Sequence, residues 1–172
     1  MIPLSEPAFF GNESKYLREC IDSGWVSSSG RYVELFEEKI SDITGSNHSI
    51  AVASGTAALH ISLILSNVNF GDEVIVPSLT FIAPINAVKY VGADPIFMDA
   101  DDFYNIDINK TIDFIKNETY YKNGFTINKI TGKRISAIIP VHVWGNAVFL
   151  DELHAICEDK NIGSHFKLDV YE

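Results

Sequence analysis

Three short segments of this sequence carry side chains suited to binding a ligand, and each follows an apolar run. The first is Ser54-Gly55-Thr56-Ala57. Gly55 allows a tight turn, and the N–H groups of Thr56 and Ala57, in the first turn of a following helix, have no partner within that helix and lie at its positive end. With the hydroxyls of Ser54 and Thr56 as further donors, this turn is expected to bind a phosphate. An N-capped crossover turn without a ligand is the alternative.

The other two segments carry an aromatic ring and an imidazole. Phe81 ends the run at residues 77–81, and its ring either stacks on a planar ligand or packs against the start of the next helix. His142 follows a predicted strand and is suited to acid–base catalysis or to contact with an anionic substrate, although a hydrogen-bonded structural histidine is the alternative. Because open α/β sheets bind ligands at the carboxyl ends of their strands, all three segments are expected at one edge of the sheet.

Other signatures of catalysis or metal binding are missing from the sequence. It contains no GxGxxG, GxxxxGK[ST], GxSxG or HExxH pattern, which disfavours dinucleotide-dependent, NTPase, serine-hydrolase and zinc-protease activity. Residues 99–102, Asp-Ala-Asp-Asp, lack the glycine and terminal glutamate of a calcium loop and are predicted to form a solvated loop. Cys20 and Cys157 are isolated from each other, so neither a disulfide framework nor a metal site is expected.

The composition is that of a globular domain with an acidic surface. The chain has 172 residues, of which 47% are hydrophobic, and its 13 Lys and Arg against 23 Asp and Glu give a net charge of −10. Because this charge repels phosphate backbones and anionic lipids, nucleic-acid and membrane binding are not expected. Residues 49–71 contain no charged side chain, but the polar residues among them favour a buried strand and helix over a membrane span. We expect a cytoplasmic protein.

Helices and strands are predicted to alternate along the chain. Helices are predicted at residues 12–21, with Asn12 as the cap, and at residues 32–44, 57–65, 81–90, 107–117 and 149–160, and strands at residues 49–53, 73–76, 95–98 and 135–141. The helix at residues 57–65 is apolar nearly all round and is expected to be buried on several sides. Two turn signals, Asn123-Gly124 and Thr131-Gly132, predict a small exposed hairpin between them. Strands that are apolar on both faces indicate an α/β fold with a mostly parallel sheet.

Five segments, taken in order, resemble the DegT/DnrJ/EryC1/StrS family of pyridoxal-phosphate-dependent sugar aminotransferases. They lie at residues 22–37, 54–60, 71–81, 92–95 and 140–145. The resemblance covers most of residues 1–161 and implies the large domain of an aspartate-aminotransferase-type fold, which is fold type I of the pyridoxal-phosphate enzymes. The predicted hairpin before Ile135 further resembles the branch of the family that serves legionaminic-acid-type sugar pathways.

The resemblance also implies a reaction and the residues that serve it. Gly55, Thr56 and Ala57 match positions that hold the phosphate of pyridoxal 5'-phosphate, Phe81 matches the aromatic residue stacked on its pyridine ring, and His142 is a candidate contact for the substrate. The implied reaction moves an amino group from glutamate to a 4-keto sugar carried on a nucleotide, for surface-polysaccharide synthesis. The implied enzyme is a homodimer with its active sites at the subunit interface.

The family pattern breaks after residue 161. There the family has a strand followed by Glu-Asp-Ala, whose aspartate pairs with the pyridine nitrogen, whereas here Ile162 is followed directly by Gly163-Ser164. The Schiff-base lysine of the family lies in a Ser-Phe-x-x-x-Lys-like segment that is absent here, and Lys167 lacks that context. We therefore assign no catalytic residue.

Two interpretations follow from this break. In the first, residues 1–161 form the N-terminal part of the large domain, residues 162–172 form a divergent tail after a truncation or deletion, and the chain alone is inactive. In the second, the chain is a non-catalytic binding or dimerising module that keeps the phosphate-binding surface.

Overall fold

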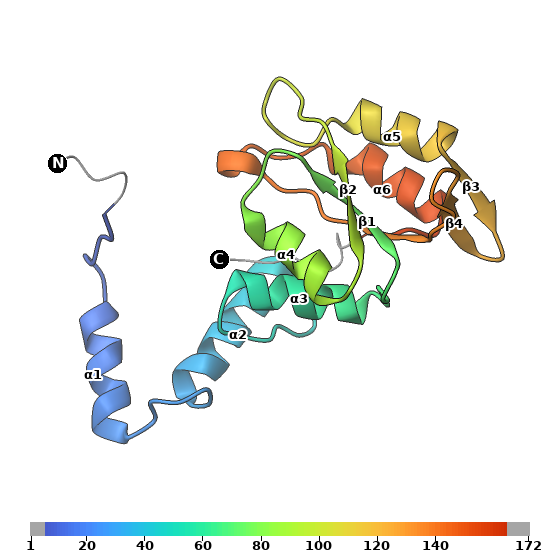
Figure 1. Ribbon diagram of the computed structural model, residues 1–172. Helices are drawn as coiled ribbons and strands as arrows, with labels where there is room; N and C mark the ends of the chain where they lie inside the picture. Colours follow the sequence, from blue (N-terminus) through green and yellow to red (C-terminus); the bar gives the residue numbers. More distant parts are fainter. Residues whose placement is uncertain (1–5, 165–172) are drawn as a thin grey trace. The chain divides into compact units, whose positions relative to one another are not determined.

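The computed structural model describes residues 6–164, and the chain divides into two compact units between Ala51 and Val52. The first unit contains two helices, α1 (Glu13–Ser23) and α2 (Arg31–Thr44) (Figure 1). Each ends, as the sequence predicts, at a glycine in the left-handed conformation. The predicted cap of α1 is wrong in one respect, because the side chain of Asn12 makes no capping hydrogen bond and the carboxylate of Glu13 accepts from the N–H of Gly11 instead.

A four-stranded parallel sheet forms the centre of the second unit. Its order is β2 (Asp94–Met98), β1 (Glu73–Pro77), β5 (Ile135–Ile138) and β6 (Gly163–Ser164), and each neighbouring pair is parallel. Successive residues of β1 alternate between the faces, so that Val74 and Val76 enter one core and Ile75 enters the other. The predicted α/β class with a parallel sheet is confirmed.

Two helices cover each face of this sheet (Figure 1). The core around Val74 and Val76 includes residues of α3 (Gly55–Leu65) and α4 (Ile82–Tyr90). The core around Ile75 includes residues of α5 (Ile108–Asn117) and α6 (Leu150–Asp159). Cys157 is buried in this second core, where burial raises the pKa of its thiol to about 12 and keeps the thiol protonated.

The predicted hairpin forms, but it is not wholly exposed. Strands β3 (Thr119–Lys122) and β4 (Phe125–Asn128) pair antiparallel across the Asn123-Gly124 turn. Thr126 and Asn128 of β4 are buried, and the hydroxyl of Thr126 donates a 2.5 Å hydrogen bond to the carbonyl of Lys160 at the end of α6. The hairpin is attached to the body of the second unit through both strands, because Thr119 of β3 is also buried and its hydroxyl donates to the carbonyl of Ile115 in α5.

Two of the predicted strands differ from the structure. Residues 49–53 form no strand, because β-favouring residues need a strand to pair with and none lies beside them among the described residues. The N–H of Ala51 donates instead to the carboxylate of Glu37 at 2.8 Å. The strand predicted at residues 135–141 ends at Ile138. The N–H of Ile139 still donates to the carbonyl of Ile75, and Pro140, which has no N–H, stops the pairing there.

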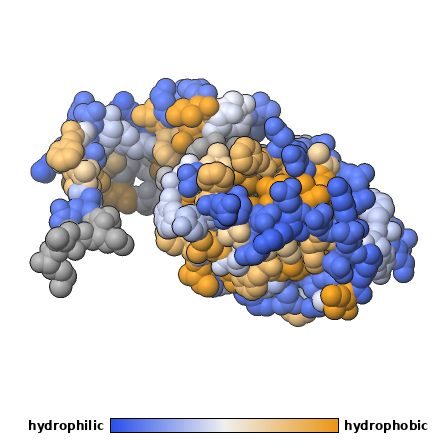
Figure 2. Space-filling view, turned by 90° about the horizontal axis from the view of Figure 1, so that it is seen from above, coloured by the Kyte–Doolittle hydropathy of each residue, from blue (hydrophilic) through white to orange (hydrophobic). Residues whose placement is uncertain are grey.

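Helix α3 is less buried than its composition predicts. Ser62 and Leu63 are its buried residues, whereas Ile61, Ile64 and Leu65 are exposed within the described chain. The prediction of burial on several sides is wrong here, because the part of the chain that the structure describes packs against one side of α3. Figure 2 likewise shows hydrophobic residues exposed among hydrophilic ones. Among residues 6–164, no helix is long and apolar enough to cross a membrane.

The last described residues extend the sheet beyond the predicted break. Ile162 is buried in the core beside α6, and Gly163 pairs with Ala137 of β5. A Cβ atom on Gly163 would lie 2.8 Å from the backbone oxygen of Ser136, so only glycine fits here without a shift of the backbone. The predicted division of the chain after residue 161 stays a prediction. Lys167 lies outside the described residues.

Candidate functional site

The topology brings the three predicted segments to the carboxyl edge of the parallel sheet. Helix α4 begins five residues after the end of β1, and His142 follows the end of β5. Helix α3, about 16 Å long at 1.5 Å per residue, ends shortly before β1 begins and packs alongside α4. Its N-terminus therefore lies at the same edge as that of α4. This is the edge where α/β sheets bind ligands.

The N-terminus of α3 presents two free N–H groups. Ser54 is the N-cap, and its hydroxyl oxygen accepts a 3.2 Å hydrogen bond from the N–H of Ala57. The expectation that this N–H is free is therefore wrong, because a serine cap satisfies it. The N–H groups of Gly55 and Thr56 have no hydrogen-bond partner among the described residues. They leave room for an anion at the positive end of the helix.

The loop between β1 and α4 contributes a buried hydroxyl and an uncovered ring. The hydroxyl oxygen of Thr80 is buried and has no hydrogen-bond partner within residues 6–164. A buried polar group without a partner costs about 1–3 kcal/mol, so this hydroxyl favours the presence of a ligand. Phe81 precedes α4 and its side chain is 82% exposed, so it does not pack against the start of that helix in the described chain.

His142 has a defined hydrogen bond at one ring nitrogen, and its other ring nitrogen has no hydrogen-bond partner among residues 6–164. Its Nδ1 atom accepts a 2.9 Å hydrogen bond from the N–H of Val148. An imidazole that accepts at Nδ1 carries its hydrogen on Nε2 in the neutral form, so the free nitrogen is a donor. The structural role left open by the sequence is therefore present, and the same hydrogen bond fixes the orientation of the ring.

Sequence reasoning missed Asn105, which joins two loops at this edge. Asn105 lies in the loop after β2 and is buried. Its side-chain oxygen accepts from the N–H of Val143 at 3.1 Å, and its side-chain nitrogen donates to the carbonyl of Ala147 at 3.3 Å. These contacts span about forty residues of sequence, and no local pattern could have revealed them. They hold the segment that carries His142 and the short 3-10 helix η1 (Val143–Gly145).

Within the described part of the chain, the lysine that the topology places at the carboxyl edge of the sheet is ion-paired. Lys110 lies in the first turn of α5, and its Nζ is 2.6 Å from the carboxylate of Asp99 and 3.6 Å from that of Asp107. The hydrogen bond to Asp99 raises the pKa of Lys110, which favours the ammonium form over the neutral amine that a nucleophile needs. Within the described residues, no group of three or more His, Cys, Asp or Glu side chains is arranged to hold a metal ion.

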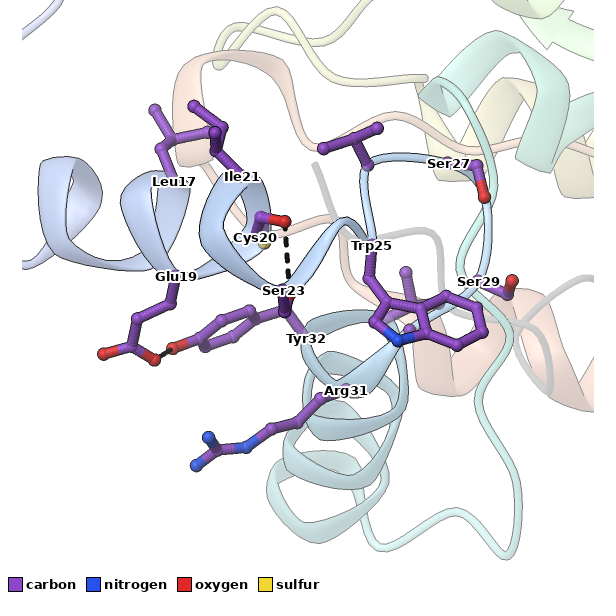
Figure 3. Close-up of a pocket in the computed structure, with 13 residues that line it drawn as sticks. Leu17, Glu19, Cys20, Ile21, Ser23, Trp25, Ser27, Ser29, Arg31 and Tyr32 are labelled. Atoms are coloured by element: carbon purple, nitrogen blue, oxygen red, sulfur yellow. Dashed lines mark hydrogen bonds between the residues drawn. The ribbon is translucent and has the colours of Figure 1, made fainter.

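The first unit contains a cavity of its own that the sequence did not predict. Its volume is about 490 Å³, and residues between Leu17 and Val33 line it. The hydroxyl of Tyr32 donates to the carboxylate of Glu19, and this hydrogen bond raises the pKa of Tyr32 to about 12 (Figure 3). Part of this lining, at residues 23–33, belongs to the segment that carries part of the family resemblance.

Fold and sequence together define the class of this protein. A parallel sheet covered by helices on both faces, with a serine-capped helix N-terminus at its carboxyl edge, is the arrangement of fold type I pyridoxal-phosphate aminotransferases. The profile of the DegT/DnrJ/EryC1/StrS aminotransferase family matches residues 9–163, and the chain belongs to this family.

Similar proteins agree with this assignment and are longer. GDP-perosamine synthase of Escherichia coli O157:H7 is 35% identical over 161 residues, which are 94% of this chain and 40% of that protein. A DegT DnrJ EryC1 StrS aminotransferase from Brucella abortus matches with a TM-score of 0.77 and 31% identity, over 88% of this chain and 38% of that one. NtdA from Bacillus subtilis with bound PMP matches with a TM-score of 0.73 and 29% identity, over 88% and 31%. The chain spans about 40% of the length of the curated relatives it matches.

Proposed function

We propose that the carboxyl edge of the sheet holds the phosphate and the ring of pyridoxal 5'-phosphate. The observation that carries this proposal is the set of unmet contacts at that edge. The N–H groups of Gly55 and Thr56 lack partners in the described chain, the hydroxyl of Thr80 is buried without one, and the ring of Phe81 is bare. A phosphorylated planar ligand satisfies groups of both kinds, so these residues fit the cofactor that the family uses.

Each residue has a distinct role in this proposal. The N–H groups of Gly55 and Thr56 bind phosphate oxygens at the positive end of α3, and Ala57 contributes to the backbone of that turn. Phe81 stacks on the pyridine ring, and the hydroxyl of Thr80 donates to the ligand. His142 points its Nε2–H toward an anionic group of the substrate. When bound, the cofactor supplies the electron sink that amino transfer requires.

The proposed reaction is amino transfer from glutamate to a 4-keto sugar linked to a nucleotide, in surface-polysaccharide synthesis. The names of the curated relatives support a GDP-linked sugar as the substrate class. Assignment to the legionaminic-acid branch stays a prediction. We further propose a cytoplasmic homodimer, as is implied by the family resemblance.

We propose that the chain alone does not complete the reaction. Among residues 6–164, the lysine that the topology places at the carboxyl edge is Lys110, and its ion pair with Asp99 favours the ammonium form. A non-catalytic module that keeps the phosphate-binding surface is the second candidate. It is supported by the two apolar cores, one on each face of the sheet, in the second unit.

Binding of pyridoxamine 5'-phosphate, measured by equilibrium dialysis, tests the site. This amine form avoids adventitious reaction of the aldehyde with surface lysines. Saturable binding is expected, and pyridoxine, which lacks the phosphate, should bind at least tenfold more weakly. Thr56→Pro removes one N–H in the first turn of α3, where that N–H has no partner within the helix, and should weaken binding, whereas Thr56→Val keeps the N–H and should retain most of it.

Two results would count against the proposal. Equal affinity for pyridoxine and pyridoxamine phosphate would remove the phosphate-binding role of α3. Conversion of pyridoxal phosphate to pyridoxamine phosphate by the chain and glutamate, faster than with the heat-denatured chain, would show that the chain alone is catalytic. No conversion by a chain that binds pyridoxamine phosphate supports both parts of the proposal.

A further inference from the structure

Two exposed aromatic side chains meet at the carboxyl edge of the sheet and have no part in the proposed cofactor site. The rings of Tyr104 and Trp144 lie edge to face, with centroids 5.2 Å apart and planes at 72°. Tyr104 lies in the loop after β2, and Trp144 lies in the segment after β5. Because β1 lies between β2 and β5, this aromatic pair bridges the two loops that flank the one carrying Thr80 and Phe81.

Both residues of the aromatic pair have an unusual backbone conformation. Tyr104 has φ 68° and Trp144 has φ 52°, in the left-handed region that bulky residues rarely adopt. Such strain persists only where the surroundings over-determine it, and it is concentrated at ligand-binding and active sites. In this protein, hydrogen bonds hold the two loops that carry the aromatic pair. The N–H of Tyr104 donates to the carbonyl of Asp101, and the neighbouring Asn105 links this loop to Val143, the residue before Trp144.

The uncovered surface of the aromatic pair indicates the chemistry of its ligand. The side chain of Trp144 is 79% exposed and that of Tyr104 is 50% exposed, so flat ring surface remains open beside the edge-to-face contact. A flat aromatic ring can stack on such a surface, and aromatic pairs are stabilised beyond the area that they bury. The exposed carboxylate of Asp102 in the same loop disfavours an anionic ring and favours one that carries N–H donors.

We propose that the aromatic pair Tyr104–Trp144 stacks on the nucleobase of the nucleotide-linked substrate. This inference rests on the proposed function, because it assumes a nucleotide substrate at this edge of the sheet. It assigns a subsite on the loops after β2 and β5, separate from the phosphate turn of α3 and from Phe81. Stacking of one base on an aromatic side chain contributes enough to change affinity by about tenfold or more.

Binding of GMP to the chain tests this subsite. The chain contains two tryptophans, so Trp25→Phe leaves Trp144 as the one tryptophan, and saturable quenching of its selectively excited fluorescence by GMP is expected. In equilibrium dialysis, Trp144→Asn should weaken GMP binding about tenfold or more, since asparagine accepts the left-handed backbone but cannot stack. Trp144→Phe keeps a ring and should retain most of the affinity. Phe103→Ala removes a nearby exposed ring that takes no part in the pair and should change nothing.

The outcomes separate this proposal from the proposed function. Absence of GMP binding, equal binding by Trp144→Asn, or an equal loss in Phe103→Ala would overturn the nucleobase subsite. Binding of ribose 5-phosphate as tight as that of GMP would also overturn it, because that probe has no base. Pyridoxamine phosphate binding is measured on the same samples. If it survives while GMP binding fails, only the subsite is wrong; if it fails while GMP binds, only the cofactor site is wrong.

Discussion

The side-chain amide of Asn128 donates a 2.8 Å hydrogen bond to the carboxylate of Glu73, which lies 55 residues earlier in the chain. Both side chains are buried, at 6% and 5% exposure. The contact joins β4 of the hairpin to the first residue of β1, at the amino edge of the sheet and thus opposite the candidate site. The hairpin therefore supplies a hydrogen-bond donor to a buried carboxylate of the sheet.

Loss of the Asn128 amide should destabilise the protein strongly. Asn128→Leu leaves the Glu73 carboxylate buried without this donor, and we expect the free energy of unfolding to fall by about 2–3 kcal/mol in urea denaturation. The double variant Asn128→Leu/Glu73→Gln should recover part of the lost free energy of unfolding, because the side chain left buried at position 73 is then a neutral amide. Asn117→Leu, an exposed change at the end of α5, is the matched control and should stay within about 0.5 kcal/mol of the parent. If the free energy of unfolding of Asn128→Leu equals that of the parent protein, this account is wrong.

Acid stability should depend on Asp94. Lys133 and Lys89 donate hydrogen bonds to its carboxylate at 2.6 and 2.8 Å and lower its pKa to about 2. Because the pKa is lower in the folded state than in the unfolded chain, about 3.9, the stabilisation is present above pH 4 and is lost as the pH falls toward 2. We therefore expect Asp94→Asn to lower the urea midpoint at pH 7 and to have little effect at pH 2.

The control for this titration is Asp113→Asn. Asp113 is exposed on α5 and makes no ion pair within residues 6–164. The urea midpoint of the Asp113→Asn variant should follow that of the parent protein across the same pH range. A difference between Asp94→Asn and the parent that persists unchanged at pH 2 would show that charge pairing is not the cause.

Gly163→Ala should weaken the pairing of β6 with β5. The new Cβ would lie 2.8 Å from the carbonyl oxygen of Ser136, which is backbone and cannot rotate away. We expect a loss of about 1–3 kcal/mol in the free energy of unfolding, together with faster hydrogen exchange at the β5 amides. Gly11→Ala is the control, since its Cβ would meet only the flexible carboxylate of Glu13. If Gly163→Ala and Gly11→Ala both unfold like the parent protein, Gly163 does not lie this close to the carbonyl oxygen of Ser136.

Substitution of Ser54 should separate helix capping from phosphate binding. Ser54→Ala removes the oxygen that accepts from the N–H of Ala57 and should cost about 1 kcal/mol of stability. Ser54→Asp keeps a capping oxygen and should retain stability, but its negative charge at the N-terminus of α3 should weaken pyridoxamine phosphate binding at least tenfold. Thermal unfolding and equilibrium dialysis measure the two effects. Binding by Ser54→Asp as tight as that of the parent would place the phosphate elsewhere.

Local patterns predicted most of the fold. The ends of α1 and α2 could be predicted from the glycine that follows each helix. Strands β1, β2 and β5 could be predicted from apolar runs between turns, because these signals act within a few residues. The errors occurred where pairing decides the outcome. Residues 49–53 favour a strand but have no partner strand, and Gly163–Ser164 form one because β5 offers an edge that admits glycine.

The candidate site divides in the same way. The Ser54-Gly55-Thr56 turn and Phe81 could be predicted, because a glycine turn before a helix and an aromatic residue after a strand are local features. Asn105 and the contact between Tyr104 and Trp144 could not, because they join segments about forty residues apart. The sequence left open which N–H groups of this turn are free. The structure shows that the N–H of Ala57 donates to the hydroxyl of Ser54 and is therefore not free.

The sequence by itself determined the α/β class, the family and the chemical types of the residues at the strand ends, because periodicity and short motifs depend on neighbours along the chain. The tertiary structure alone decided which of these residues have partners. It left Thr80 buried without a partner in the described chain, fixed Lys110 beside Asp99 and brought Tyr104 to Trp144. Those outcomes depend on how the parallel sheet aligns its carboxyl ends, and that alignment exists only once the strands have paired.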